Sequence, residues 1–112
     1  MQFKAPKNNE RYFWTGHALG KMQYYGLTAQ RILRVINRPA RIEEGVAEKT
    51  TAVMQPASIN GKKKTWSSEI WAMYQLANGQ YKIISAWRYP GVSPKRNYVP
   101  EEIMEEVKEL IS

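Results

Sequence analysis

Hydrophobic positions recur with a helical period in the first third of the chain and with a period of two beyond it. Two helices are therefore predicted, one between Thr15 and Gly26 and one between Thr28 and Asn37, each opened by a threonine that can cap it. Their apolar faces consist of Ala18, Leu19, Met22 and Tyr25 in the first helix and Ala29, Ile32, Leu33 and Ile36 in the second. The aromatic segment Arg11–Thr15 has the composition of a short strand or of a strand-like lead-in.

Four further strands are predicted where β-branched and aromatic residues replace the helical pattern. They cover Ile42–Val46, Lys49–Gln55, Trp66–Leu76 and Gln80–Tyr89. A last helix covers residues 99–112, with Glu101 and Glu102 in its first turn, and we expect Ile103, Val107 and Leu110 to pack it. This order predicts an α+β fold: two N-terminal helices packed on an antiparallel sheet of about four strands, plus an acidic C-terminal helix. We expect one domain over residues 1–112, with a mobile tail at residues 1–9.

The Asn78-Gly79 pair is a strong hairpin signal, so the register of the last two strands can be written out. Starting from Ala77 opposite Gln80, this register pairs Met73 with Ile84, Trp71 with Ala86 and Glu69 with Arg88 on one face. Both faces of the hairpin are largely apolar, which predicts a central position in the sheet.

Composition excludes much catalytic chemistry. The 112 residues include one histidine, His17, and contain no aspartate and no cysteine, so an ordinary zinc site cannot be assembled within one chain. Ser-His-Asp and Cys-His arrangements fail for the same reason, and magnesium sites usually need aspartate clusters. We therefore expect no metal and no cofactor, and either metal-free chemistry on a polyanion or plain binding of one.

Positive charge is concentrated in the first part of the chain. Residues 1–64 carry 7 Lys and 5 Arg against 4 Glu, a net charge of +8, whereas residues 65–112 carry 5 basic residues against 6 Glu, a net charge of −1. Such a charge attracts phosphate backbones, so RNA or another polyanion is the expected partner, although surplus lysine also keeps proteins soluble. The acidic helix could limit access of anions to this basic face, or it could simply be solvated.

Several residues are candidates for nucleic-acid binding. Arg31, Arg34 and Arg38 lie on one face of the second helix, and Lys62, Lys63 and Lys64 form a basic turn after Asn60-Gly61. Tyr25, with Tyr24 and Tyr89, could stack on bases, whereas the four tryptophans are expected in the core. The alternative is that these cations form only a solvated surface.

Four segments of the first third of the chain carry a resemblance to a known family. They are Arg11-Tyr12-Phe13-Trp14-Thr15-Gly16-His17-Ala18, then Lys21-Met22, Tyr25-Gly26-Leu27-Thr28 and a helix ending in Asn37-Arg38-Pro39. Together they resemble a bacterial family of unknown function related to RelE-type toxins. Lys82–Arg88 resembles the last strand of that family, and residues 11–90 correspond to its RelE-like core. The resemblance implies the barnase, EndoU, colicin and RelE superfamily, whose active members cut RNA without metal. His17, Lys21 and Arg88 match polar positions of the pattern, but Tyr25 stands where the family usually has arginine.

The function expected from this resemblance is metal-independent endoribonuclease activity of toxin type, in which a 2′-hydroxyl attacks the adjacent phosphate. His17 can transfer a proton, Arg88 can clamp the phosphate and Lys21 can assist, so these three are the predicted catalytic residues. Structural roles stay open: His17 could bond backbone carbonyls and Arg88 could pair with Glu69 across the strands.

Two other functions stay open: a non-catalytic RNA-binding module and a protein-interaction module on the same fold. An antitoxin or other protein partner is expected for the toxin reading. We expect a cytoplasmic protein with no membrane contact, since no apolar run is long enough for a signal peptide or a membrane span. The sequence leaves the oligomeric state unknown.

Overall fold

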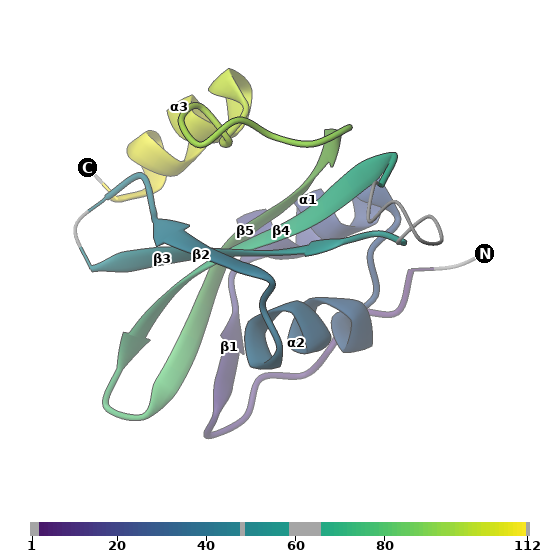
Figure 1. The fold of residues 1–112 in the computed structure, drawn as a ribbon. Coiled ribbons are helices and arrows are strands. Elements are labelled where there is room, and N and C mark those ends of the chain that lie inside the picture. The colour runs from purple at the N-terminus through teal and green to yellow at the C-terminus, as the bar shows by residue number, and fades with distance from the viewer. Residues whose placement is uncertain (1–2, 48, 59–65, 112) are drawn as a thin grey trace.

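The computed structural model describes residues 3–47, 49–58 and 66–111. Its elements in chain order are β1 (Tyr12–Trp14), α1 (Gly16–Tyr25), α2 (Ala29–Asn37), β2 (Arg41–Glu44), β3 (Thr50–Pro56), β4 (Ser68–Ala77), β5 (Gln80–Pro90) and α3 (Glu101–Ile111), as Figure 1 shows. The strands form one sheet in the order β1-β5-β4-β3-β2. The α+β prediction is confirmed, but the sheet has five strands rather than four, because β1 joins it and runs parallel to β5.

Both predicted helix caps are present. Thr15 Oγ1 accepts the N–H of Ala18 at 3.1 Å, and Thr28 Oγ1 accepts the N–H of Arg31 at 3.1 Å. Gly26 ends α1 with φ of 69°, a left-handed conformation that glycine adopts without strain. Thr15 therefore sets the start of α1, and Gly26 and Thr28 set the turn between α1 and α2, as the sequence predicts.

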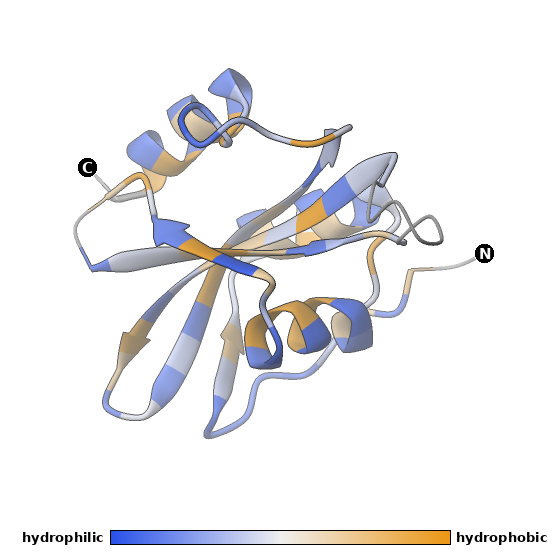
Figure 2. Ribbon diagram, viewed as in Figure 1, coloured by the Kyte–Doolittle hydropathy of each residue, from blue (hydrophilic) through white to orange (hydrophobic). Residues whose placement is uncertain are grey.

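The sheet separates two hydrophobic cores. The first lies between the sheet and the helices α1 and α2, and includes Trp14, Met22, Ile32 and Ile83. The second lies under α3 on the opposite face, and includes Trp71, Trp87, Ile103 and Val107. Figures 1 and 2 show α2 and α3 on opposite sides of the sheet, each with alternating hydrophobic and hydrophilic residues. Tyr25 contacts both cores, because α1 lies along the edge of the sheet beside β5.

Helix α3 is part of the core rather than an added segment. Ile103 and Val107 are fully buried, as predicted, and pack on the tryptophans of β4 and β5. Leu110 was expected to pack as well, but this prediction is wrong, since 55% of the residue is exposed. The buried pair fixes α3 to the sheet, while its glutamates face outward or toward α1.

The N-terminal segment makes contacts with the rest of the domain. Phe3 packs against the first core, and Asn8 Oδ1 accepts the N–H of Trp14 at 2.7 Å. Asn9 Oδ1 accepts the N–H groups of Arg11 and Tyr12, which shapes the turn into β1. These contacts place the described part of residues 1–9 against the domain, and the mobility of this segment stays a prediction.

The hairpin register is confirmed near its turn and wrong farther along. Ala77 lies opposite Gln80 and Tyr74 opposite Ile83, but a β-bulge then places Met73 opposite Ser85. The bulge coincides with the start of α1, where Thr15 Oγ1 donates to the carbonyl oxygens of Ile83 and Ile84, at 2.9 and 3.2 Å respectively. Pairing is shifted by one residue beyond this point.

The shift changes which residues share a face. Trp71 lies opposite Trp87 instead of Ala86, and the two indoles stack with ring centroids 5.7 Å apart. Arg88 lies opposite Ile70, which belongs to the first core, and not opposite Glu69. The expected cross-strand pair of Glu69 and Arg88 is therefore absent, because these side chains lie on opposite faces of the sheet.

Candidate functional site

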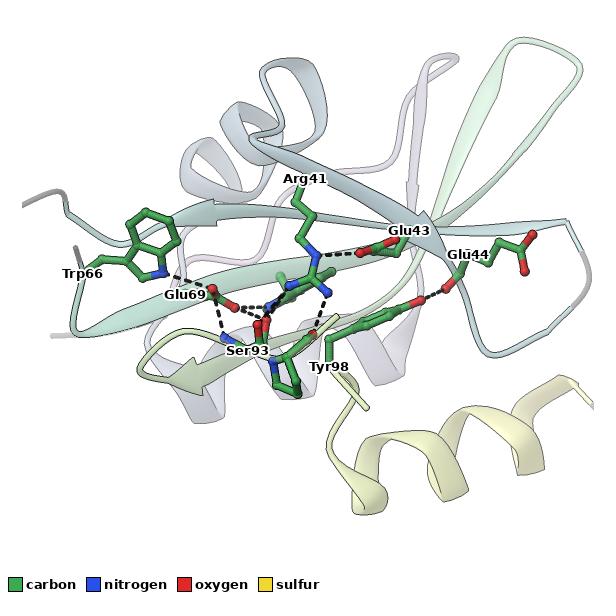
Figure 3. Close-up of polar contacts among 9 residues, drawn as sticks. Arg41, Glu43, Glu44, Trp66, Glu69, Ser93 and Tyr98 are labelled. Atoms are coloured by element: carbon green, nitrogen blue, oxygen red, sulfur yellow. Dashed lines mark hydrogen bonds and ion pairs between the residues drawn. The ribbon is translucent and has the colours of Figure 1, made fainter. Parts of the chain in front are cut away.

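Glu69 is a fully buried carboxylate on the α3 face of β4, and Figure 3 shows its partners. It accepts hydrogen bonds from the indole N–H groups of Trp66 at 2.9 Å and Trp71 at 3.0 Å. The backbone N–H and the hydroxyl of Ser93 also donate to it. Burial alone would raise the pKa of Glu69, but the hydrogen bonds outweigh burial, so its pKa lies below the usual value. Glu69 is thus an ionised structural anchor for the loop after β5.

Arg41 on β2 holds the same loop from the other side. Its guanidinium donates to Ser93 Oγ at 2.9 Å and to the carbonyl oxygen of Pro94 at 2.7 Å, and it forms an ion pair with Glu43. It also lies 5.2 Å from the ring centroids of Trp71 and Tyr98 (Figure 3). The described partners of Glu69, Ser93 and Arg41 all lie within the protein, so this network accounts for how the loop after β5 is held.

His17 and Lys21 lie one turn apart on α1 and meet a carboxylate from α3. Glu106 Oε1 lies 2.9 Å from Lys21 Nζ, and Glu106 Oε2 lies 3.4 Å from His17 Nδ1. The other ring nitrogen of His17, Nε2, lies 3.1 Å from the hydroxyl oxygen of Ser85 in β5. The arrangement links α1, β5 and α3 through one imidazole.

Electrostatics favour a neutral imidazole at this position. Burial lowers the pKa of His17, Glu106 opposes this effect and Lys21 adds to it, so the pKa lies below 6.5. Glu106 outweighs the effect of burial on Lys21 and raises its pKa. Ser85 is fully buried, which makes it a hydrogen-bond partner of His17 rather than an accessible nucleophile.

Arg88 does not join His17 and Lys21, which corrects the three-residue catalytic arrangement expected from the sequence. Its Nε donates to the carbonyl oxygen of Tyr25 at 2.8 Å, at the C-terminal end of α1. Ser85 pairs with Met73 of the second core, whereas Arg88 pairs with Ile70 of the first. His17, through Ser85, and Arg88 therefore lie toward opposite faces of the sheet, since Ser85 and Arg88 are three residues apart on β5.

Arg88 instead lies with arginines of α2. Gln55, Ile70 and Arg88 form one row across β3, β4 and β5 on the α2 face. Above this row, the Arg31 guanidinium donates to Gln55 Oε1 and, at 3.1 Å, to the carbonyl oxygen of Pro56. Burial, Arg34 and Arg88 lower the pKa of Arg31. We call Arg31, Arg34 and Arg88 the arginine cluster.

The arginine cluster has no acidic partner among the described residues. In the described part of the chain, Glu106 pairs with His17 and Lys21, and Glu43 pairs with Arg41. The polar contacts that hold the cluster are carbonyl and amide oxygens, which are neutral. Arg34 and Arg88 both lie near enough to Arg31 to lower its pKa, and grouped guanidiniums without a described carboxylate favour an anion.

The remaining predicted binding residues border this cluster or lie outside the described residues. Arg38 is exposed at the C-terminal cap of α2, and its carbonyl oxygen accepts from Gln55 Nε2 at 2.6 Å. Tyr25 is half-buried, and burial and Glu102 raise its pKa. Tyr24 is 75% exposed beside it. Lys62, Lys63 and Lys64 lie outside the described residues.

Sequence reasoning missed three residues that define these sites. Glu106 was seen only as one charge of an acidic helix. It lies three residues after the buried Ile103 and directly before the buried Val107, which limits how far its side chain can point from the core. No sequence pattern marks Gln55 or Ser85 as a site residue, because their contacts with Arg31 and His17 depend on which strands and helices lie next to each other. Trp14, Trp71 and Trp87 are buried, as predicted.

No protein-family model, curated protein or solved structure matches the chain. In the part of the chain that the structure describes, no helix is long and apolar enough to cross a membrane.

Proposed function

We propose that this protein binds RNA or another single-stranded nucleic acid, and that the arginine cluster holds its phosphates. The observation that carries the proposal is the grouping of Arg31, Arg34 and Arg88 with no described carboxylate in ion-pair contact. Guanidinium groups bind phosphate oxygens in a bidentate manner, and the formal net charge of +7 favours association with a polyanion.

The test is the affinity for a fluorescently labelled single-stranded RNA, measured by anisotropy at several salt concentrations. Replacing Arg31, Arg34 and Arg88 by Gln together should weaken binding and reduce the salt slope by about 2, since each phosphate contact on a single strand contributes about 0.7. The matched control replaces Lys95, Arg96 and Lys108 by Gln, which removes the same charge from exposed positions elsewhere. Equal weakening in both variants would show that only net charge acts and would contradict the proposal.

Metal-free RNA cleavage at His17 is the second candidate function. It is favoured by one observation, a partly buried imidazole with a lowered pKa one turn from Lys21. In this reaction the 2′-hydroxyl attacks phosphorus and its proton passes to His17. The bond from phosphorus to the 5′-oxygen breaks as that oxygen takes a proton from Lys21 or water, which leaves a 2′,3′-cyclic phosphate. RNA would have to displace Glu106, which now contacts both His17 and Lys21. Arg88 has no place in this version of the mechanism.

Incubation of the protein with a long RNA in EDTA separates the two candidates. Cleavage that disappears in His17→Ala and persists in the arginine variant would support the second candidate. Binding without cleavage would support the first alone. The expected antitoxin partner and the protein-interaction alternative stay predictions. They would be tested by identifying a protein that binds this chain without competing with RNA.

A further inference from the structure

A groove of about 740 Å³ lies between the N-terminal segment Phe3–Lys7 and the turn that joins α1 to α2. Residues from the end of α1 and from the first turn of α2 line its other side. The described residues that line it include two lysines and no carboxylate. Its volume falls within the range of about 300–1,000 Å³ that is usual for small-molecule sites.

The lining combines the groups that a nucleotide needs. Phe3 offers an aromatic ring, and the amides of Gln23 and Gln30 can both donate and accept hydrogen bonds, as base edges require. Lys4 and Lys7 are exposed cations that can meet a phosphate. An acidic peptide would satisfy the lysines and could pair its backbone with the amides, but its acidic side chains would leave the aromatic ring of Phe3 without a matching group.

The groove adjoins the arginine cluster along the chain. Gly26 lines the groove and follows Tyr25, whose carbonyl oxygen accepts the hydrogen bond from Arg88. Gln30 lines it and precedes Arg31 in the first turn of α2. That turn contains no acidic residue, so the positive end of α2 adds to the same local field.

We propose that this groove binds one nucleotide of the RNA strand whose phosphates the arginine cluster holds, an inference that rests on the proposed function. The base lies against Phe3 and between the two glutamine amides. Lys4 and Lys7 bind the phosphate of that nucleotide, and the next phosphates follow the α2 surface to the arginines.

The test uses the full chain and three separate probes: AMP, adenosine and inorganic phosphate, each titrated while backbone amide shifts are recorded by NMR. AMP should shift the amides of Gln23, Thr28 and Gln30, and adenosine should shift the same set at higher concentration. Ala5→Trp places a large side chain at an exposed position of the groove wall, and it should weaken AMP binding at least tenfold.

A double variant with Lys4→Gln and Lys7→Gln keeps the inference testable if the tryptophan distorts the segment. It should weaken AMP binding about fivefold and leave adenosine binding unchanged, because only the phosphate contact is removed. The control variant carries Lys95→Gln and Arg96→Gln, exposed positions that do not line this groove. It should bind AMP like the parent.

Three results would overturn the inference: shifts by AMP at other residues only, equal affinity for AMP and inorganic phosphate, or an acidic peptide that binds where AMP does not. If Ala5→Trp binds RNA as tightly as the parent while the arginine variant loses RNA, the groove inference fails and the proposed function stands. If AMP binds in the groove while the arginine variant binds RNA normally, the proposed function fails and the groove remains a nucleotide site.

Discussion

The two faces of the sheet differ in whether their charged side chains have charged or hydrogen-bonding partners that neutralise them. On the α3 face, Glu69 accepts hydrogen bonds from two indoles and Ser93, and Glu106 pairs with His17 and Lys21. On the α2 face, Arg31 and Arg88 are held by neutral oxygens, and no described carboxylate pairs with them.

This difference distinguishes charged side chains that stabilise the fold from charged side chains that could still bind a ligand. A charge whose partners are all internal contributes to folding and has little left for a ligand. Grouped cations without counter-charges lower the stability of the fold slightly, and an anion would relieve their repulsion. The comparison therefore supports a structural role for the charges of the α3 face and is consistent with the proposed binding at the α2 face.

The largest expected effect is on stability, from Glu69→Ala. This change leaves two indole N–H groups and the two Ser93 donors without an acceptor, which should cost about 3 kcal/mol or more of unfolding free energy. Urea denaturation followed by tryptophan fluorescence measures the loss. Glu105→Ala, at an exposed position of α3, is the control and should change the stability by less than about 0.5 kcal/mol. Similar losses in both variants would show that Glu69 is not an anchor.

The next largest effect is expected when the hydrogen bonds that hold the arginine cluster are removed but the arginines are kept. Gln55→Leu keeps the side-chain size but removes the acceptor for Arg31 and the donor to the carbonyl oxygens of Arg34 and Arg38. We expect a loss of about 1 kcal/mol in stability, and RNA affinity should fall severalfold, because Arg31 is no longer held in place. Unchanged RNA affinity with reduced stability would mean that the position of Arg31 is irrelevant to binding.

A smaller effect concerns the ion pairs of Glu106. Glu106→Gln should reduce stability by only about 0.5 kcal/mol, since the carboxylate is partly exposed. It should also lower the pKa of His17 further, because Glu106 is the group that raises it. As His17 is the sole histidine of the chain, one imidazole proton resonance in an NMR titration reports this pKa directly. A pKa that rises in the variant would contradict the described contact.

The smallest effect is a gradual dependence of stability on pH. The pKa of His17 is lowered in the folded state, so its contribution to stability is complete above about pH 6.5 and decreases as the pH falls below that value. Glu69 follows the same direction below about pH 4.5, because its pKa is lowered as well. Urea midpoints between pH 8 and pH 4 should therefore fall, and His17→Ala should remove the first part of the decrease.

The sequence predicts the elements well, because the threonine caps, Gly26 and the Asn78-Gly79 turn act locally. It fails where one element acts on another. The bulge in β5 depends on α1 meeting the carbonyl oxygens of Ile83 and Ile84, and no pattern within residues 68–90 indicates it. The face of Arg88, and with it the membership of the candidate site, depended on that single contact.

The bulge also sets a rule for recognising relatives of this chain by their sequences. Counting from the hairpin turn, one inserted residue decides whether the arginine of β5 or the tryptophan before it faces the helices α1 and α2. A related sequence with one position fewer between Gly79 and Arg88 would keep its arginine opposite Ile70 if the strands paired without the bulge, and would move it to the face of Glu69 if the bulge were retained. The number of residues in this stretch is therefore as informative as their identity about which face carries the arginine. A sequence alignment that removes a one-residue gap here would hide a change of face.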